Sequence, residues 1–479
     1  MELLYNNTPI KKLWYNRLME EENVDLFEKV VNLTKRRGFI YPSSEIYGGF
    51  SGVYDYGPIG VLLANNIKNH WWKNMVQKRP DIVGLDSGIF MSPKVWEASG
   101  HVSGFSDPLM ENKKNGNRVR ADHILEEIGV VADEKMSIEE INELLQKNSV
   151  ALKKTGFNID EYSEAKYFNL LVKSNLGDFT EQNDNPTYLR GETCQGIYLN
   201  YKNVLDTTSQ KIPYGIAQIG KAFRNEISAR QFIFRTREFE QMEMQYFVRP
   251  EEEMVEYEAL KEFRWKSLLS LGIKPENLQW HKHENLVFYA REAYDIEFKY
   301  PFGFKELEGI HARGNYDLTQ HSTYSGQKLE YFDEEKKEHF LPHIIESSIG
   351  VGRLFLAILC QSYTEEQVGD DMRIVLRIPK HIAPIQIAIL PLSKKDELSI
   401  PASSLFEELS DNFMCQYDET QSIGKRYRRQ DEIGTPYCIT YDFDSINDNM
   451  VTVRERDTME QERVSISELV VYLQNKFKS

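Results

Sequence analysis

Residues 214–248 read YGIAQIGKAFRNEISARQFIFRTREFEQMEMQYFV, and the rest of the chain is organised around this stretch. It predicts two antiparallel strands joined by an arginine-rich loop, with the first strand ending in the segment 223–226 and the second beginning near Phe239. Strand side chains alternate between faces. One face of the second strand is therefore expected to carry Phe239, Gln241 and Glu243. The opposite face is suited to core packing, with Met242, Met244 and Tyr246.

Such a hairpin suits a bound nucleotide. Arginine forks match phosphate oxygens, and arginines stand at the end of the first strand and in the loop: Arg224, Arg230, Arg235 and Arg237. Phe239 offers a stacking surface for a base, and Glu243 lies roughly 13 Å further along at about 3.3 Å per residue. The alternative is a solvated hairpin whose exposed ion pairs contribute little.

The pattern F-R-x-E at 223–226, a loop, and R-x-x-x-F at 235–239 resembles motif 2 of class II aminoacyl-tRNA synthetases. Its wording is similar to that of glycyl-tRNA synthetases of the single-chain, homodimeric type. ESSIGVGR at 346–353 resembles their motif 3, with a strand, a glycine turn and a helix whose first turn holds Arg353. A helix at 61–77, a strand at 81–91 and Pro93 resemble the degenerate motif 1 of the dimer interface.

The composition limits the partners. A length of 479 residues predicts two or three domains. The net charge of −16 argues against a nucleic-acid coat protein, so a surface that binds tRNA must be local. Four scattered cysteines without a CxxC predict neither a structural zinc site nor disulfides. No apolar stretch reaches the ~20 residues of a membrane span, and the N-terminus lacks a signal sequence, so a cytoplasmic protein is expected.

The resemblance implies an α+β fold in two domains. Residues 1–376 would form the class II catalytic domain, an antiparallel sheet flanked by helices. A charged, helical insertion at about 125–177 would be either a solvated module or a contact to the tRNA acceptor arm. Residues 377–479 resemble an anticodon-binding α/β domain, with a helix at 401–413 and a final helix capped by Ser465 and Glu468.

The anticodon-binding domain is not basic overall, because acidic residues outnumber basic ones from Lys380 onward. Its one basic cluster consists of Lys425, Arg426, Arg428 and Arg429. Half of this cluster is expected to pair with Asp431 and Glu432.

Three further segments carry candidate site residues. Arg190 and Glu192 share a face if their segment is extended, and in the family this segment lines the amino-acid pocket. Period-2 alternation places Glu306 and Glu308 on one face, and carboxylates beside phosphates are ligands for Mg²⁺. His101 is interpreted as a loop histidine rather than a catalytic one.

The implied reaction joins ATP and glycine into glycyl-adenylate and then transfers glycine to tRNA-Gly. Arg224, Glu226 and Arg353 are the expected catalytic residues, and Glu306 the Mg²⁺ ligand. The expected ATP contacts are Arg224, Asn225, Glu226, Phe234, Arg235, Phe239, Glu306, Leu307, Gly350, Gly352 and Arg353. The expected glycine contacts are Arg120, Glu192, Phe239, Gln241, Glu243, Glu346, Ser348 and Gly350. Two alternatives remain: a synthetase for another amino acid, and a non-enzymatic paralogue that keeps the fold.

Overall fold

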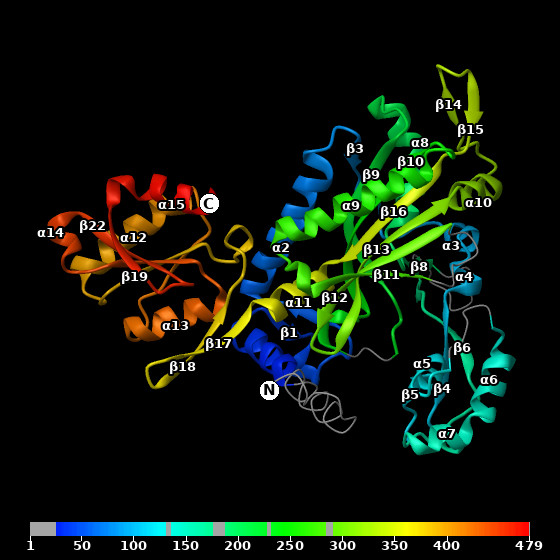
Figure 1. Cartoon of the computed structure of the whole chain (residues 1–479), viewed down its shortest axis with the longest axis horizontal. Coiled ribbons are helices and arrows are strands. Elements are labelled where there is room, and N and C mark those ends of the chain that lie inside the picture. Colours follow the sequence, from blue (N-terminus) through cyan, green and yellow to red (C-terminus); the bar gives the residue numbers. More distant parts are fainter. Residues whose placement is uncertain (1–24, 131–135, 176–186, 228–230, 284–290, 479) are drawn as a thin grey trace, which may run out of the picture.

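A seven-stranded sheet forms the centre of the computed structural model, which describes residues 25–130, 136–175, 187–227, 231–283 and 291–478 (Figure 1). The strand order is β11-β12-β13-β16-β10-β9-β3. Neighbours pair antiparallel except β3, which runs parallel to β9. The bounds are β3 (Ile82–Gly84), β9 (Tyr214–Phe223), β10 (Glu238–Val248), β11 (Leu278–Lys282), β12 (Glu292–Tyr300), β13 (Gly303–Gly314) and β16 (His343–Gly350). The predicted hairpin is confirmed as β9 and β10.

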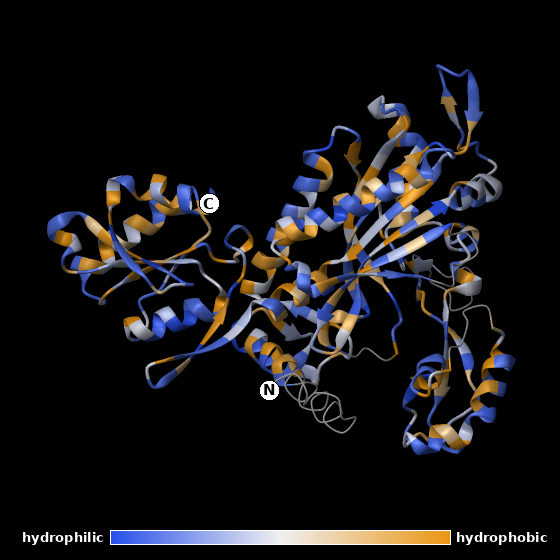
Figure 2. Cartoon of the chain, in the orientation of Figure 1, coloured by the Kyte–Doolittle hydropathy of each residue, from blue (hydrophilic) through white to orange (hydrophobic). Residues whose placement is uncertain are grey.

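Three helices cover the apolar face of this sheet: α2 (Pro58–Trp72), α9 (Glu253–Leu271) and α11 (Val351–Ser362). They share one buried core with Met242 and Met244 of β10, as the alternation predicts. Figure 2 shows α11 as largely apolar, which fits a helix buried against the sheet. On the opposite face α8 (Cys194–Thr208) packs Tyr201 against Tyr214 and Phe247. The rest of that face is left for the site.

Smaller elements surround the sheet. The first described helix covers residues 25–36. The others include β1 (Ile40–Pro42), β2 (Tyr54–Tyr56), α3 (Pro93–Ala98), α4 (His101–Gly104), β7 (Val172–Ser174), β8 (Thr187–Leu189), α10 (Tyr316–Ser325), β14 (Tyr331–Asp333), β15 (Glu338–Phe340), β17 (Tyr363–Val368) and β18 (Asp371–Leu376). Among the described residues, no helix has the length and apolar composition that crossing a bilayer requires.

The strand expected at 81–91 is much shorter than predicted, because β3 ends at Gly84. Beyond it, the Leu85 amide still donates to the Ala217 carbonyl at 2.9 Å. The Ser87 amide then donates to the side chain of Gln218. The Gln218 side chain thus takes the place of a backbone carbonyl as acceptor, and the backbone pairing of β3 with β9 ends. The preceding helix also starts earlier than expected, at Pro58, and ends in a π-helical turn, Lys73–Gln77.

The insertion is more than helical, which corrects the expectation for 125–177. A three-stranded sheet, β5-β4-β6, lies beside its helices. The elements are β4 (Ser106–Glu111), β5 (Arg118–Arg120), α5 (Ala121–Glu126), α6 (Ile138–Lys147), α7 (Ser149–Lys154) and β6 (Lys166–Asn169). Because β4 pairs with β6 in register, the module includes residues from Ser106 onward. Its own buried core contains Met110, Leu125 and Leu145.

A second sheet, β20-β19-β21-β22-β23, forms the C-terminal part and has its own core (Figure 1). Its elements are β19 (Ile387–Pro391), α12 (Asp396–Ser410), β20 (Cys415–Tyr417), α13 (Ile423–Ile433), β21 (Tyr437–Tyr441), α14 (Ser445–Asp448), β22 (Met450–Glu455), β23 (Gln461–Ser465) and α15 (Leu469–Lys478). The predicted capping box is wrong: a 3-10 turn, Ile466–Glu468, precedes α15, and the Ser465 hydroxyl pairs with Ser467 instead.

Candidate active site

The polar face of the β9–β10 hairpin forms the floor of the site. Arg224 follows directly after β9, and its guanidinium lies 5.4 Å from the ring centre of Phe239 and 5.2 Å from that of Phe105. Its Nε donates to the Gly191 carbonyl at 3.1 Å. Cation–π contacts and this hydrogen bond hold the guanidinium beside the open face. Arg224 and Phe239, predicted as neighbours in one site, therefore do lie together.

The loop between the two strands is braced by Glu226. Its buried carboxylate pairs with Arg235 at 2.9 Å, and its carbonyl accepts from Arg237 at 2.7 Å. Arg230 lies outside the described residues. The loop thus presents two arginines that are held by one residue, Arg235 by the Glu226 side chain and Arg237 by the Glu226 carbonyl.

Arg120 lies in the inserted module. It pairs with Asp107 at 2.9 Å and with Asp122, and both partners are largely buried. Burial raises the pKa of Asp107, while the positive charges of Arg120 and Arg235 act to lower it. The charges of Arg235 and Glu226 act on Asp107 and Arg120, so the module adjoins the motif 2 loop. The ion pairs of Arg120 lie within the module itself.

The turn between β16 and α11 forms another side of the site. Arg353, in the first turn of α11, pairs with Glu306 at 2.9 Å and lies 4.6 Å from the ring centre of Phe234. A Cβ on Gly352 would lie 2.8 Å from the Ile233 carbonyl oxygen, so glycine is needed there for close approach. At Gly350 a Cβ would meet only Arg353, at 3.8 Å, which leaves room for a side chain.

Glu306 and Glu308 do not share a face, contrary to the prediction from alternation. A bulge in the β12–β13 pairing sets Ile296 opposite Glu308 and Glu297 opposite Glu306. The extra residue reverses the alternation. Glu308 is fully buried on the helix side, bonded to Arg264 and Ser347, whereas Glu306 faces Arg353.

A buried carboxylate pair lies at the inner end of the site. Register places Gln245 opposite Glu346 and Glu243 opposite Ser348, so these side chains share one face. The Gln245 amide donates to Glu243 at 3.2 Å and to Glu346 at 3.0 Å. Ser348 accepts from Gln241 at 3.2 Å. Four of the residues predicted for glycine thus form one continuous polar patch.

The two carboxyl groups differ in protonation. Burial and the charge of Glu346 raise the pKa of Glu243 well above its usual range. Burial acts in the same direction on Glu346, but Arg313 and His311 overcome it and hold the pKa of Glu346 low. Arg313 Nη1 and His311 Nδ1 lie 3.0 and 2.9 Å from Glu346 Oε2. The two pKa values are therefore shifted in opposite directions, and Glu346 ionises before Glu243.

Glu192 closes the patch from another element. It lies in the turn before α8, and its Oε1 is 3.2 Å from His101 Nε2. Burial would raise the pKa of Glu192, but His101 and Arg313 hold it well below its usual range. His101 is thus part of the site rather than the loop histidine expected. Cys194 donates to Glu192, and burial raises the pKa of its thiol, which keeps it protonated.

Arg190 does not share a strand face with Glu192, because β8 ends at Leu189 and the chain turns. Its buried guanidinium donates to the carbonyls of Lys221 and Ser87 at 2.5 and 2.9 Å. Arg190 therefore fixes the backbone behind the site.

Sequence patterns missed several residues that the site brings together: His101, Thr193, Gln245, His311 and Arg313. The polar spacing of Gln245 after Glu243 was a usable signal. Nothing in the sequence pointed to Arg313, because the residue type alone does not distinguish a buried arginine from an exposed one.

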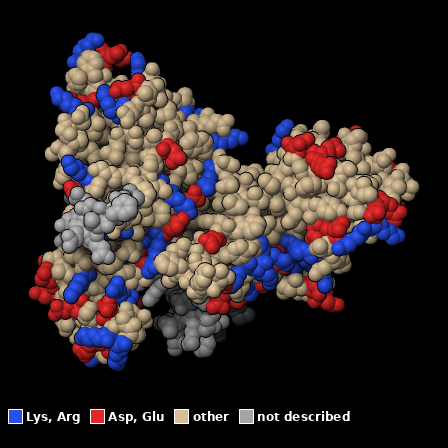
Figure 3. All heavy atoms as spheres, turned by 180° about the vertical axis from the view of Figure 1, so that it is seen from behind, with Lys and Arg blue, Asp and Glu red and all other residues tan. Residues whose placement is uncertain are grey.

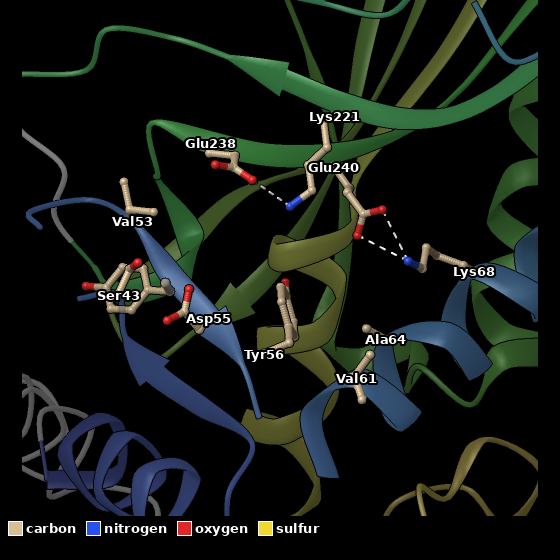
Figure 4. A pocket seen from close by; sticks show the side chains of 11 residues that line it. Ser43, Val53, Asp55, Tyr56, Val61, Ala64, Lys68, Lys221, Glu238 and Glu240 are labelled. Atoms are coloured by element: carbon tan, nitrogen blue, oxygen red, sulfur yellow. Dashed lines mark hydrogen bonds and ion pairs between the residues drawn. The ribbon is translucent and has the colours of Figure 1, made fainter. Parts of the chain in front are cut away.

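A cavity of about 430 Å³ lies on the other face of the same hairpin, between β2, α2 and the end of β10 (Figure 4). Lys221 pairs with Glu238 at 2.8 Å, and Lys68 with Glu240 at 3.1 Å. Glu238 and Glu240 alternate along β10 with Phe239 and Gln241, so the cavity and the site lie on opposite faces of the sheet.

Two regions of the chain match known families. Residues 178–362 match the tRNA synthetase class II core domain (G, H, P, S and T), and residues 386–476 match the anticodon binding domain. The antiparallel sheet with its arginine-framed face, followed by the second α/β unit, is thus a class II aminoacyl-tRNA synthetase fold. The expected α+β fold class is confirmed.

Comparison with curated relatives identifies the family within this class of synthetases. Glycine–tRNA ligases of Treponema denticola, Acetivibrio thermocellus and Macrococcus caseolyticus are 48%, 50% and 49% identical to this chain. The matches cover 96%, 94% and 96% of the chain and 99%, 98% and 100% of the relatives. The chain belongs to the glycine–tRNA ligase family and is an aminoacyl-tRNA ligase. This result disfavours both alternatives left open by the sequence.

Proposed function

We propose that the protein activates glycine with ATP to glycyl-adenylate and then transfers glycine to the 3′ end of tRNA-Gly. The observation that carries this proposal is the cluster of half-buried Glu192 with buried Glu243 and Glu346, next to the Arg224–Phe239 surface. A cluster of carboxylates suits an ammonium ion, because charge-assisted hydrogen bonds to ionised groups are the strong ones. The adjacent arginines suit phosphates.

In the first step a glycine carboxylate oxygen attacks the α-phosphorus. A new oxygen–phosphorus bond forms, and the bond to the pyrophosphate oxygen breaks. No side-chain nucleophile is needed, since the protein positions the reactants and stabilises charge. Arg224 would hold the glycine carboxylate and the α-phosphate, and Phe239 would stack on adenine.

The outer phosphates would meet Arg235 and Arg353, and the turn at Asn225, Phe234, Leu307, Gly350 and Gly352 would line the nucleotide. Mg²⁺ accompanies ATP in such enzymes, and one or two carboxylates beside phosphates suffice to hold it. Glu306 fits, because it is half-exposed and, among the described residues, it pairs with Arg353, which would itself turn to the phosphates. The ion would offset phosphate charge.

Glycine would be recognised through its ammonium group. Glu192 and Glu346 are ionised, and Glu243 completes the enclosure. Gln241 and Ser348, which are joined by a hydrogen bond, would fill the space that a larger amino acid needs. Arg120 would contribute from the side of the inserted module.

The second domain would recognise tRNA. We place its boundary at 376/377, with the inserted module at about 125–177 extended back to residue 106. Exposed Lys425 and half-exposed Arg428 on α13 are the candidate contacts. Figure 3 shows basic side chains along the lower side of this part of the molecule, where Figure 1 places α13.

The protein would act as a homodimer in the cytoplasm, through the motif 1 region around residues 61–93. Trp71 gives no support for this, because it is buried in the protein's own core. Trp72 packs over Gly84, where a Cβ would lie 2.5 Å from the indole. Sedimentation would test the proposal: a stable, active monomer at micromolar concentration would contradict it.

ATP–pyrophosphate exchange with each amino acid tests the activity. Exchange with glycine alone is the expected result. Exchange with another amino acid at a comparable rate would refute the proposed substrate, and no exchange with any would refute the adenylate step.

A further inference from the structure

Three side chains outside the proposed substrate contacts converge on neighbouring strands. His283 follows β11, Asp295 lies on β12 and His311 on β13. Gly309 stands opposite Asp295 in the register. A Cβ on Gly309 would lie 3.1 Å from the His311 ring and 3.5 Å from Asp295 Oδ1. The missing side chain lets the two groups approach each other.

The spacing of the three groups fits a metal ion. His283 Nε2 is 2.9 Å from Asp295 Oδ2, and His311 Nε2 is 3.8 Å from Asp295 Oδ1. One ligand atom from each residue lies within 4.8 Å of the others. Around a tetrahedral zinc ion with bonds near 2.0–2.1 Å, ligand atoms are separated by about 3.4 Å. Small side-chain shifts would therefore close the site.

The second ring nitrogen of His311 is already engaged. His311 Nδ1 is 2.9 Å from Glu346 Oε2, which leaves Nε2 for an ion. Metal-bound histidines commonly donate their other N–H to a carboxylate, which fixes the tautomer and the ring orientation. Asp295 is buried, and the cations beside it are the imidazoles of His283 and His311, which lower its pKa to about 2. A bound ion would replace protons on these imidazoles.

We propose that His283, Asp295 and His311 bind one divalent transition-metal ion of the zinc type. Two imidazoles and one carboxylate suit zinc or its first-row neighbours and leave an open position. Mg²⁺ and Ca²⁺ prefer oxygen ligands. The site is distinct from the proposed Mg²⁺ contact at Glu306, and through His311 it abuts the carboxylate Glu346.

The full-length protein, stripped of metal by a chelator, tests this site. Zinc is titrated in competition with a chromophoric chelator, with glycine saturating so that the amino-acid pocket is filled. Cobalt is titrated in parallel and its visible absorption followed. One zinc per chain is expected, unaffected by a large excess of Mg²⁺. His283→Ala and Asp295→Asn are expected to weaken binding roughly tenfold or more.

His339→Ala is the matched control, because His339 is exposed on the β14–β15 hairpin, away from the site. It should bind zinc as the parent does. His281→Ala should do the same, although its ring lies 5.3 Å from His283. Equal affinity in His283→Ala and the parent, loss in His281→Ala alone, or absence of stoichiometric binding would overturn the assignment.

Thermal unfolding gives an independent measure. Zinc at 100 times its dissociation constant should lower the unfolding equilibrium constant of the parent about 100-fold. The same zinc concentration should lower that constant only about 11-fold or less in His283→Ala, whose site is expected to bind at least tenfold more weakly. A shift of equal size in both proteins would place the ion elsewhere and overturn the proposal.

Discussion

Glu243 and Glu346 lie on one face of β10 and β16, bridged by the side-chain amide of Gln245, and their pKa values are shifted in opposite directions. Arg313 and His311 select Glu346 as the ionised partner. Two buried carboxylates this close cannot both ionise without a further cation. A bound ammonium group would be such a cation.

Glycine binding should therefore release a proton. The ammonium group should lower the pKa of Glu243. At a pH between the Glu243 pKa in the free protein and that in the glycine complex, binding should therefore release the Glu243 proton. Affinity for glycine should rise with pH in that window, because the ionised form binds better. Calorimetry in buffers of different ionisation enthalpy measures the release, and Glu243→Gln should abolish it. An unchanged release in that variant would assign the proton elsewhere.

Arg224→Ala should lower the rate of glycine-dependent pyrophosphate exchange by two to three powers of ten. A preorganised cation at developing charge contributes roughly 3–4 kcal/mol to the transition state. Lys221→Ala is the control, since its partner Glu238 lies on the cavity side of the sheet. Near-parental exchange by folded Arg224→Ala would refute the role of this arginine.

Glu192→Gln should raise the glycine KM roughly ten- to a hundredfold, because hydrogen bonds to charged groups contribute about 1.5–3 kcal/mol. Glu238→Gln makes the same chemical change on the opposite face and should leave the KM alone. If the glycine KM of Glu192→Gln stays at the parental value, Glu192 does not contact the ammonium group.

Ser348→Gly should relax the rejection of alanine. Ser348 stands opposite Glu243, where the patch is already filled by the Gln241 contact. Removing its side chain makes room for a methyl group, and the ratio of alanine to glycine kcat/KM should rise roughly tenfold. Exchange assays with both amino acids measure this ratio. A ratio that does not move would exclude Ser348 from selectivity.

Lys425→Ala combined with Arg428→Ala should weaken tRNA binding and charging but spare pyrophosphate exchange. Each lost phosphate contact should reduce the slope of log affinity against log salt by about one. Lys394→Ala, in the exposed turn before α12, is the control. Parental affinity and salt slope in the double variant would show that α13 does not contact tRNA.

The basic cluster on α13 shows how tertiary contacts redistribute charge. Arg426 is buried and donates to backbone carbonyls, including that of Pro391, and Arg429 pairs with Asp418. The expected pairing with Asp431 and Glu432 is wrong. Asp431 is bonded to Arg373 and Arg454, and Glu432 to Arg36 and Arg37. Arg426 and Arg429, three residues apart in sequence, thus have unrelated surroundings.

The sequence by itself determined the hairpin, its two faces and the turn before α11, because alternation and glycine turns are local properties of the backbone. Phe239, Gln241 and Glu243 share the open face as the period of two requires. The motif wording also identified the family.

Only the tertiary structure decided which charged groups act together. One bulge sent Glu308 into the core and left Glu306 beside Arg353. His101 meets Glu192, and His311 meets Glu346, across long stretches of chain. The protonation of Glu243 depends on burial and on neighbours brought in by folding. Electrostatic energies depend on distance and desolvation in three dimensions, and neither is encoded in the spacing of residues along the chain.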